Sequence, residues 1–352
     1  MKDLVSCFSE HAVRISDVAC SGAANAAAGA PEPGGGGVAA GGRAAVVSAV
    51  TTVYRSRLSA SGKELLLEVT WSRAPDGPAL SVAVHEAAAR HSATAAPRHL
   101  HRKKGSGTFT AGSCVVGVFW DYAAARYASA SAGAAGPEPA SGFYVAVVAD
   151  AEFVLLLGDL SRGYVERLHG GIPIAASRVA RRRERFVGGC GCWSTRARFS
   201  EAGAEHEVAV VMMDGGDGAE AWVTVDGRKV AQLRRLRWNF RGSHTIFLDG
   251  GAPVDVTWDL HGWLFHAGAG AAPPPLGSSS AASSSSCAVF TFQARGASET
   301  RLLTTEDDDD TGAGEEQAPG SGRRHKPGGG GGASGQGFCL LIQGFRGFSK
   351  ST

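Results

Sequence analysis

The stretch GVFWDY (residues 117–122) has a counterpart much later in the chain, DVTWDL (residues 255–260). In both, a run of β-forming residues ends on Trp-Asp, and the character of the sequence then changes. Val, Thr, Phe and Trp favour a pleated strand, whereas Asp interrupts one because its side chain competes for nearby backbone N–H groups. The two stretches therefore predict matching strand ends in two parts of the molecule.

The pairs Trp120-Asp121 and Trp258-Asp259 close a series of anchors that occurs twice in the same order. The other matched anchors are RLS (57–59) with RFS (198–200), DG (76–77) with DG (217–218), VAV (82–84) with VTV (223–225), and KGSGTF (104–109) with RGSHTI (241–246). Most of them fall on turn residues, as expected of copies that keep their backbone geometry while their core side chains diverge. The order predicts that one β unit is present twice.

Between the anchors, the apolar segments are short, alternate with polar residues and end at Gly, Asp or Pro. Residues 64–71, 205–213 and 220–225 are typical. Alternation with a period of two is the pattern of a half-buried strand. The sequence therefore predicts an all-β fold, an antiparallel sandwich or a barrel-like core built from two similar β units, with disordered Gly/Ala/Ser-rich insertions. Periodicity alone does not separate the sandwich from the barrel.

Shifts in composition divide the chain further. The predicted parts are a mostly disordered N-terminal segment (1–45), a first β unit (46–160), an Arg-rich connection (161–192), a second β unit (193–295) with a disordered insertion at 267–286, a second disordered insertion (296–335) and a returning C-terminal strand (336–348). Segments of Gly, Ala, Ser, Pro or charge bury too little apolar surface to offset the entropy of ordering them. We expect a short helix around 177–185 and expect strands after long insertions to add at a sheet edge.

Bulk composition excludes several classes of protein. With 35 basic and 33 acidic residues the net charge is +2, which gives no general attraction to nucleic acid or to an acidic membrane. The seven scattered cysteines indicate free thiols in a reducing compartment. Charged residues interrupt any apolar stretch near the start, and no segment is apolar enough to span a bilayer. The sequence thus predicts an intracellular protein, cytoplasmic or nuclear, without a secretory signal or a transmembrane segment.

Long motifs spread along the chain resemble a plant-specific family, domain of unknown function 868. They are MKDLVSCFSE (1–10), VTW (69–71), VFWD (118–121), GPEPASGFYVAVVAD (136–150), VLLLGD (154–159), LRWNFRG (236–242), VTWDLHGWLF (256–265) and GFCLLI (337–342). The resemblance covers nearly all of the chain outside the insertions and implies a plant source. It supplies no activity, cofactor or catalytic residue. The long Gly/Ala/Ser insertions depart from the family's pattern.

Asp121 and Asp259 occupy matching positions, and a duplicated fold can bring two such carboxylates together as a proton-sharing dyad. Dyads of this kind need tight Gly turns that expose both carboxylates, whereas here a Trp precedes each Asp and a bulky residue follows it. The favoured interpretation is that each Asp ends its strand and caps the next turn.

His99 and His101 have the spacing of a metal pair on a strand, but no third ligand lies nearby and the next three residues are basic. An exposed basic edge strand is favoured there.

Cys190 and Cys192 lack the two-residue spacer of thioredoxin-like sites and a second cysteine pair. We therefore predict no metal site and no cofactor.

Two basic clusters are weak candidates for interaction. Arg181, Arg182, Arg183 and Arg185 could bind phosphate or an acidic lipid, or serve as a nuclear address, but a solvated face is favoured, which the acidic run at 306–310 could neutralise. Residues 234–240 mix Arg235 and Arg237 with Trp238, a composition found on surfaces that bind single-stranded nucleic acid. Aromatic residues in strand patterns more often belong to the core, so nucleic acid is disfavoured as a partner.

These observations leave three hypotheses for function. Because no catalytic constellation is complete, the sequence favours a non-catalytic binding or interaction module, with a protein or a small apolar ligand as its partner. The alternative is a carrier of a small apolar, lipid-like ligand, which an apolar cavity of several hundred Å³ would support. An enzyme with an Asp- or His-based site is the least favoured.

Overall fold

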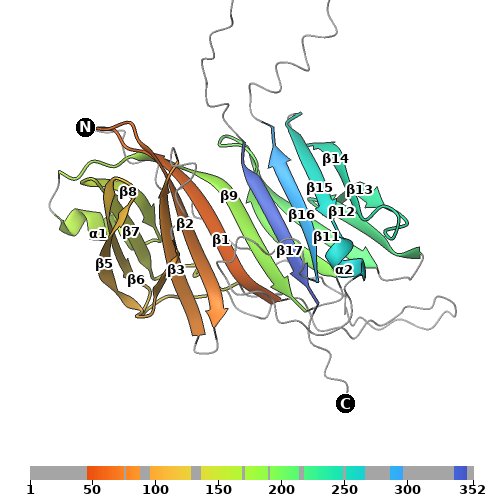
Figure 1. Cartoon of the computed structure of the whole chain (residues 1–352), viewed down its shortest axis with the longest axis horizontal. Coiled ribbons are helices and arrows are strands. Elements are labelled where there is room, and N and C mark those ends of the chain that lie inside the picture. Colours follow the sequence, from red (N-terminus) through yellow and green to blue (C-terminus); the bar gives the residue numbers. More distant parts are fainter. Residues whose placement is uncertain are drawn as a thin grey trace, which may run out of the picture.

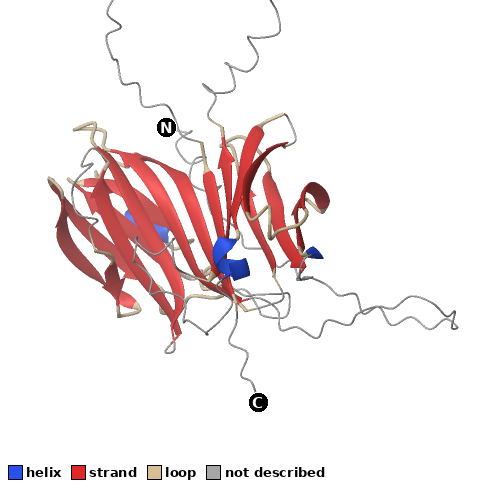
Figure 2. Cartoon of the chain, turned by 45° about the vertical axis from the view of Figure 1, so that its right-hand side comes forward, coloured by secondary structure: helices blue, strands red, loops and turns tan. Residues whose placement is uncertain are grey.

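The computed structural model describes residues 46–74, 77–87, 96–127, 136–168, 171–188, 191–213, 218–248, 251–265, 286–295 and 337–346. The segments predicted to be disordered lie almost entirely outside these ranges. Strands dominate the described part of the chain, and the only helices there are α1 (Ser161–Arg167) and α2 (His261–Phe265). The predicted all-β class is confirmed (Figure 2).

The first half of the chain forms two four-stranded antiparallel layers. The first layer contains β1 (Val46–Arg57), β2 (Glu64–Ala74), β3 (Gly77–Glu86) and β4 (Arg98–Leu100), and the second contains β5 (Lys104–Ala111), β6 (Cys114–Asp121), β7 (Tyr144–Ala149) and β8 (Glu152–Leu157). Their inward side chains form one apolar core, in which Trp71 (2% exposed) packs edge-on against Tyr122 and Phe143. Within each layer every strand pairs with the next one in sequence, as the alternating pattern and short turns dictate.

The second half repeats this arrangement. One layer contains β10 (Cys192–Arg198), β11 (Glu205–Met213), β12 (Glu220–Val225) and β13 (Arg228–Leu233), and the other contains β14 (Arg241–Phe247), β15 (Pro253–Asp259), β16 (Cys287–Ala294) and β17 (Cys339–Phe345). A separate apolar core fills the space between these layers, with Trp193, Phe290 and Phe292 at its centre. The chain therefore folds as two sandwiches.

Strand β9 (Ala176–Val187) joins the two sandwiches. It pairs antiparallel with β1 and parallel with β17, which merges one layer of each half into a nine-stranded sheet of order β14-β15-β16-β17-β9-β1-β2-β3-β4 (Figure 1). The prediction of a helix around 177–185 is wrong. Each arginine of this run has a cross-strand partner on β1, and pairing on both edges satisfies the backbone groups of the strand from Arg181 to Val187.

The barrel alternative is excluded within the described residues, because their strands form three sheets and none of these closes on itself. A closed eight-stranded meander would pair its first strand with its last. Here β1 pairs with β9 instead of β8, and β17 pairs with β9 instead of β10. In each sandwich, therefore, the first and last strands lie in different layers and do not pair with each other. We call this junction between the two layers the seam.

Tight turns set the register of the neighbouring strands. Asp150 and Ala151, between β7 and β8, have φ angles of 46° and 66°, and Asp226 and Gly227, between β12 and β13, have φ angles of 50° and 75°. Two successive residues with positive φ form the turn whose twist matches that of a β-hairpin. Asp and Gly are among the residues that favour such turns.

The last strand of the chain lies inside the sheet. β17 sits between β16 and β9, so the expectation that strands after long insertions end at a sheet edge is wrong here. Its sequence explains the position, because Leu340 and Ile342 are fully buried. The structure also contains β5, which the sequence pattern did not indicate.

Candidate functional site

The Trp-Asp pair of the first half fixes the corner where β6 ends. The indole N–H of Trp120 donates a hydrogen bond to the carbonyl oxygen of Arg102 at 2.8 Å. The Asp121 carboxylate accepts the backbone N–H of Ala123 at 3.1 Å and pairs with Lys104 at 2.9 Å. Although partial burial raises the pKa of Asp121, the hydrogen bonds from Lys104 and Ala123 outweigh it and hold that pKa below its usual value.

The second Trp-Asp pair makes the same contacts at the end of β15. The indole N–H of Trp258 donates to the carbonyl oxygen of Asn239 at 3.1 Å. The Asp259 carboxylate accepts the backbone N–H of His261 at 3.0 Å and pairs with Arg241 at 3.0 Å. The contacts match those of the first corner one for one.

A glycine lies opposite each tryptophan. Gly105 pairs with Trp120 across the strands, and a Cβ at Gly105 would come within 2.8 Å of the indole ring. Gly242 pairs with Trp258 in the same way, and a Cβ there would collide with that ring. The two aspartates, by contrast, belong to different sheets and are each bound by their own strand neighbours. Capping is confirmed as their role, and they do not form a dyad.

The arginines of β9 do not share one solvated face. Arg181 is exposed and Arg183 half-buried, whereas Arg182 and Arg185 are only 3% and 8% exposed. The prediction of a solvated cluster is therefore wrong for Arg182 and Arg185. Arg182 lies on the same face of β9 as Glu184, with which it forms an ion pair, whereas Arg185 lies on the opposite face, where its guanidinium is 4.8 Å from the centre of the Phe345 ring.

Arg182 is held in a buried ion-pair network. Its Nε contacts Oε1 of Glu184 at 2.6 Å and its Nη2 contacts Oε2 of Glu138 at 2.9 Å. Thr195, on β10, donates a second hydrogen bond to Oε1 of Glu184 at 2.7 Å. Burial alone would lower the pKa of Arg182, but the two carboxylates raise it above its ordinary value, so the group stays charged. This network ties β9 to both halves of the molecule.

The turn between β13 and β14 presents Trp238 to solvent. This residue is 87% exposed, so the prediction that the tryptophans of this pattern belong to the core is wrong at this position. β13 ends at Leu233, and the strand alternation therefore does not reach Trp238. Arg235 and Arg237 flank it and are also exposed. An interaction role for these three residues stays a prediction.

The remaining candidates do not form a metal centre in the described part of the chain. His99 lies on the exposed edge strand β4, as predicted, and its ring centroid is 6.3 Å from that of His101. No group of three or more His, Cys, Asp or Glu side chains there could hold a metal ion. Cys114 and Cys339 are free thiols, whereas Cys192 is disulfide-bonded. The prediction of free thiols is wrong for Cys192.

A hollow of about 610 Å³ lies at the seam of the first sandwich, between β1, β8 and β9. It exists because β8 has no strand partner on this side apart from an isolated parallel bridge between Phe153 and Ile174. A hydrogen bond from the Ser56 hydroxyl to the Val154 carbonyl, 2.6 Å long, connects β1 to β8. Ladder pairing of these two strands would have filled the gap.

One wall of the hollow is apolar. It is formed by side chains of β8 and by residues just before and on β9, namely Phe153, Val154, Leu155, Leu156, Leu157, Ile174, Ala175, Ala176 and Val179. Tyr54 of β1 completes this wall, and burial together with the charge of Glu138 raises the pKa of its hydroxyl above the ordinary value. Tyr54 is therefore neutral at physiological pH, and its hydroxyl is hydrogen-bonded to Thr52.

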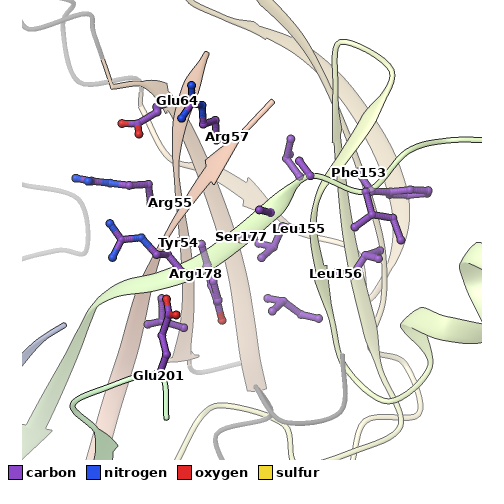
Figure 3. A pocket seen from close by; sticks show the side chains of 16 residues that line it. Tyr54, Arg55, Arg57, Glu64, Phe153, Leu155, Leu156, Ser177, Arg178 and Glu201 are labelled. Atoms are coloured by element: carbon purple, nitrogen blue, oxygen red, sulfur yellow. The ribbon is translucent and has the colours of Figure 1, made fainter. Parts of the chain in front are cut away.

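The rest of the wall carries charge. Arg55 and Arg57 come from β1, Arg178 from β9, Glu64 from β2 and Glu201 from the turn after β10. None of the five forms an ion pair with any other described residue. In Figure 3 Arg55, Arg57 and Glu64 lie on one side of β9, whereas the labelled leucines and Phe153 lie on the other. The hollow therefore extends from the seam, past the first residues of β9, to the other side of this strand.

The sequence did not reveal this hollow. The arginines of β1 lie in a predicted strand, and Arg178 belongs to the basic run 178–185, but nothing local shows that β1 and β9 are neighbours. The leucines of β8 were interpreted as ordinary strand residues. Only the pairing of β1 with β9 brings these groups together, and no local pattern in the sequence indicates that pairing.

The fold and the hollow define an all-β, two-sandwich protein with an open hollow at one seam. No helix in the described ranges is long and apolar enough to cross a bilayer. Comparison with family models identifies the relatives of the chain: residues 45–346 match the model described as "Plant protein of unknown function (DUF868)". The chain belongs to this plant family, as its motifs predicted. No curated protein and no solved structure matches it.

Proposed function

We propose that this protein is a non-catalytic binding module that holds a small ligand with an apolar body in the hollow between β1, β8 and β9. The observation that carries the proposal is the hollow itself, about 610 Å³ in volume and walled by contiguous leucines. That volume is in the range of pockets that hold small molecules, which are mostly apolar with a few polar groups. The two sandwich cores are filled with side chains, so the ligand binds beside them.

This proposal joins two of the hypotheses drawn from the sequence. A carrier would hold its ligand inside a closed cavity, whereas this hollow is open to solvent at the edge of a sheet. The domain boundaries and the intracellular location remain part of the proposal.

The test uses the neutral apolar dye Nile red and two matched variants. Ile174 lines the hollow and is 40% exposed, while Val115 is 60% exposed on β6 and does not line it. Ile174→Glu places a charge against the apolar wall and should weaken dye binding by about tenfold or more, because burying an unpaired carboxylate is costly. Val115→Glu should leave binding unchanged. Equal dye binding by the wild-type protein and both variants would contradict the proposal.

A further inference from the structure

The hollow has two chemically different parts. The leucines of β8 line the seam on one side of β9, and Arg55, Arg57 and Arg178 line the other side (Figure 3). A ligand that fills both parts needs an apolar segment and a polar end that can reach around the beginning of β9. The identity of that polar end follows from the groups that face it.

Arg55 and Arg178 are direct cross-strand partners in the ladder between β1 and β9. Like charges placed opposite one another on neighbouring strands are destabilising. Strands usually avoid this arrangement or place a carboxylate beside it. Here neither guanidinium forms an ion pair with any residue that the structure describes, so the repulsion is uncompensated within the described chain.

Two buried polar atoms are also unsatisfied, one of them within this pair and the other on the opposite face of β9. Nε of Arg55 and Oγ of Ser177 are buried, and neither has a hydrogen-bond partner within the described residues. Ser177 is the neighbour of Arg178 on β9 and also lines the hollow. Buried polar atoms without a hydrogen-bond partner are rare, because a buried hydrogen bond that is not made costs free energy. The two unsatisfied atoms therefore point to a ligand group that would bind to them.

The surrounding charges favour an anion. Three guanidinium groups and two carboxylates, those of Glu64 and Glu201, line this part of the hollow, which leaves one net positive charge. The planar fork of a guanidinium matches the two oxygens of a carboxylate or a phosphate, and such charge-assisted bonds are among the strongest in proteins. An anion between Arg55 and Arg178 would relieve their repulsion and satisfy Nε of Arg55.

We propose that the ligand is an amphipathic anion, whose carboxylate or phosphate group binds between Arg55 and Arg178 while its apolar chain lies against the leucines of β8. Arg57, at the end of β1, extends the basic surface toward solvent. This inference rests on the proposed function and adds to it the chemical class of the ligand. A fatty acid and a phosphate monoester of a lipid share this chemistry, and the experiment separates them.

The experiment measures displacement of Nile red from the full-length protein by three twelve-carbon compounds: dodecanoate, dodecyl phosphate and the neutral dodecan-1-ol. The variants are Arg55→Gln and Arg178→Gln, which remove one guanidinium each. Arg228→Gln is the matched control, because Arg228 is an exposed arginine on β13 that does not line the hollow. Thermal unfolding of each variant shows whether it is folded.

At least one of the two anions should displace the dye at a concentration roughly ten- to a hundredfold below that of the alcohol, as expected for a charged hydrogen-bonded pair. The more effective anion identifies the head group. Arg55→Gln and Arg178→Gln should abolish this preference without lowering the unfolding temperature, and Arg228→Gln should retain it. If alcohol and anions compete equally in the wild-type protein, the anionic assignment is wrong while the proposed function stands. Failure of Nile red to bind at all would overturn the proposed function itself.

Discussion

The seams of the two sandwiches differ although their corners agree. In the alignment that matches Arg57 with Arg198, Thr52 corresponds to Trp193, and the indole ring of Trp193 lies directly against Gly344 of β17. The same ring packs edge-on against Trp263, with ring centroids 5.4 Å apart. The second seam is thus closed by one large side chain, whereas the first contains a hollow.

The arginines at the two seams also differ in whether a carboxylate lies near them. Arg196, the counterpart of Arg55, lies 3.9 Å from a carboxylate oxygen of Glu205. Arg55 lies opposite Arg178 instead and has no such partner. Where the halves agree, they preserve the fold; where they differ, the first half leaves space and unpaired charge. This difference is the reason why we propose that a ligand binds in the first half.

The largest effect is expected when the closed seam is opened. Trp193→Ala removes a side chain that is 1% exposed and should lower the free energy of unfolding by about 3–5 kcal/mol, because a cavity is left beside Gly344. Trp238→Ala, at an 87% exposed position, should change it by less than about 0.5 kcal/mol. Urea denaturation measures both. A loss below about 1 kcal/mol at Trp193 would show that its ring does not close the seam.

A somewhat smaller loss is expected at the strand that separates the two seams. Arg182→Met leaves Glu184 buried without its cation and should lower the free energy of unfolding by about 3 kcal/mol. This value is at the lower end of the range for broken buried ion pairs, because Glu138, the other partner of Arg182, is partly hydrated. Arg181→Met, at the exposed neighbouring position, is the control and should be nearly neutral. Comparable losses for the two variants, measured by urea denaturation, would contradict the buried network.

The two corners should respond equally to loss of one hydrogen bond. Trp120→Phe and Trp258→Phe keep an aromatic ring but remove the indole N–H that donates to a backbone carbonyl, and each should cost about 1 kcal/mol. The measurement is again the free energy of unfolding. A difference larger than about 1 kcal/mol between the two variants would mean that the corners are alike in geometry but not in energy.

The smallest effect concerns the dependence of stability on pH at the first corner. The pKa of Asp121 is lowered in the folded protein, so its contribution is fully present above the unfolded-state pKa and is lost as the pH falls through the folded-state value. Asp121→Asn should therefore cost about 0.5 kcal/mol at pH 7 and nothing in strong acid, below both values. Urea denaturation along a pH series tests this, and a constant cost at every pH would contradict it.

What the sequence predicted well is local. Strands β11 and β12 have the bounds that alternation predicts, and the positive φ angles at Asp150 and Asp226 follow from residues that favour tight turns. The sheet class and the capping role of Asp121 and Asp259 also depend only on neighbours in sequence.

What the sequence did not predict depends on distant strands. An arginine-rich run has no clear period, and only pairing with β1 on one edge and β17 on the other makes β9 a central strand that buries Arg182 and Arg185. The hollow likewise exists because β1 pairs with β9 instead of β8. No local pattern in the sequence encodes that choice of partner.

Native mass spectrometry of the protein purified from plant tissue tests the central claim most directly. The account predicts one bound small molecule per chain, amphipathic and anionic, that is retained by wild-type protein and lost from the Ile174→Glu variant prepared in the same way. Wild-type protein that carries no ligand, or a ligand retained equally by the Ile174→Glu variant, would contradict the assignment of the hollow as the binding site.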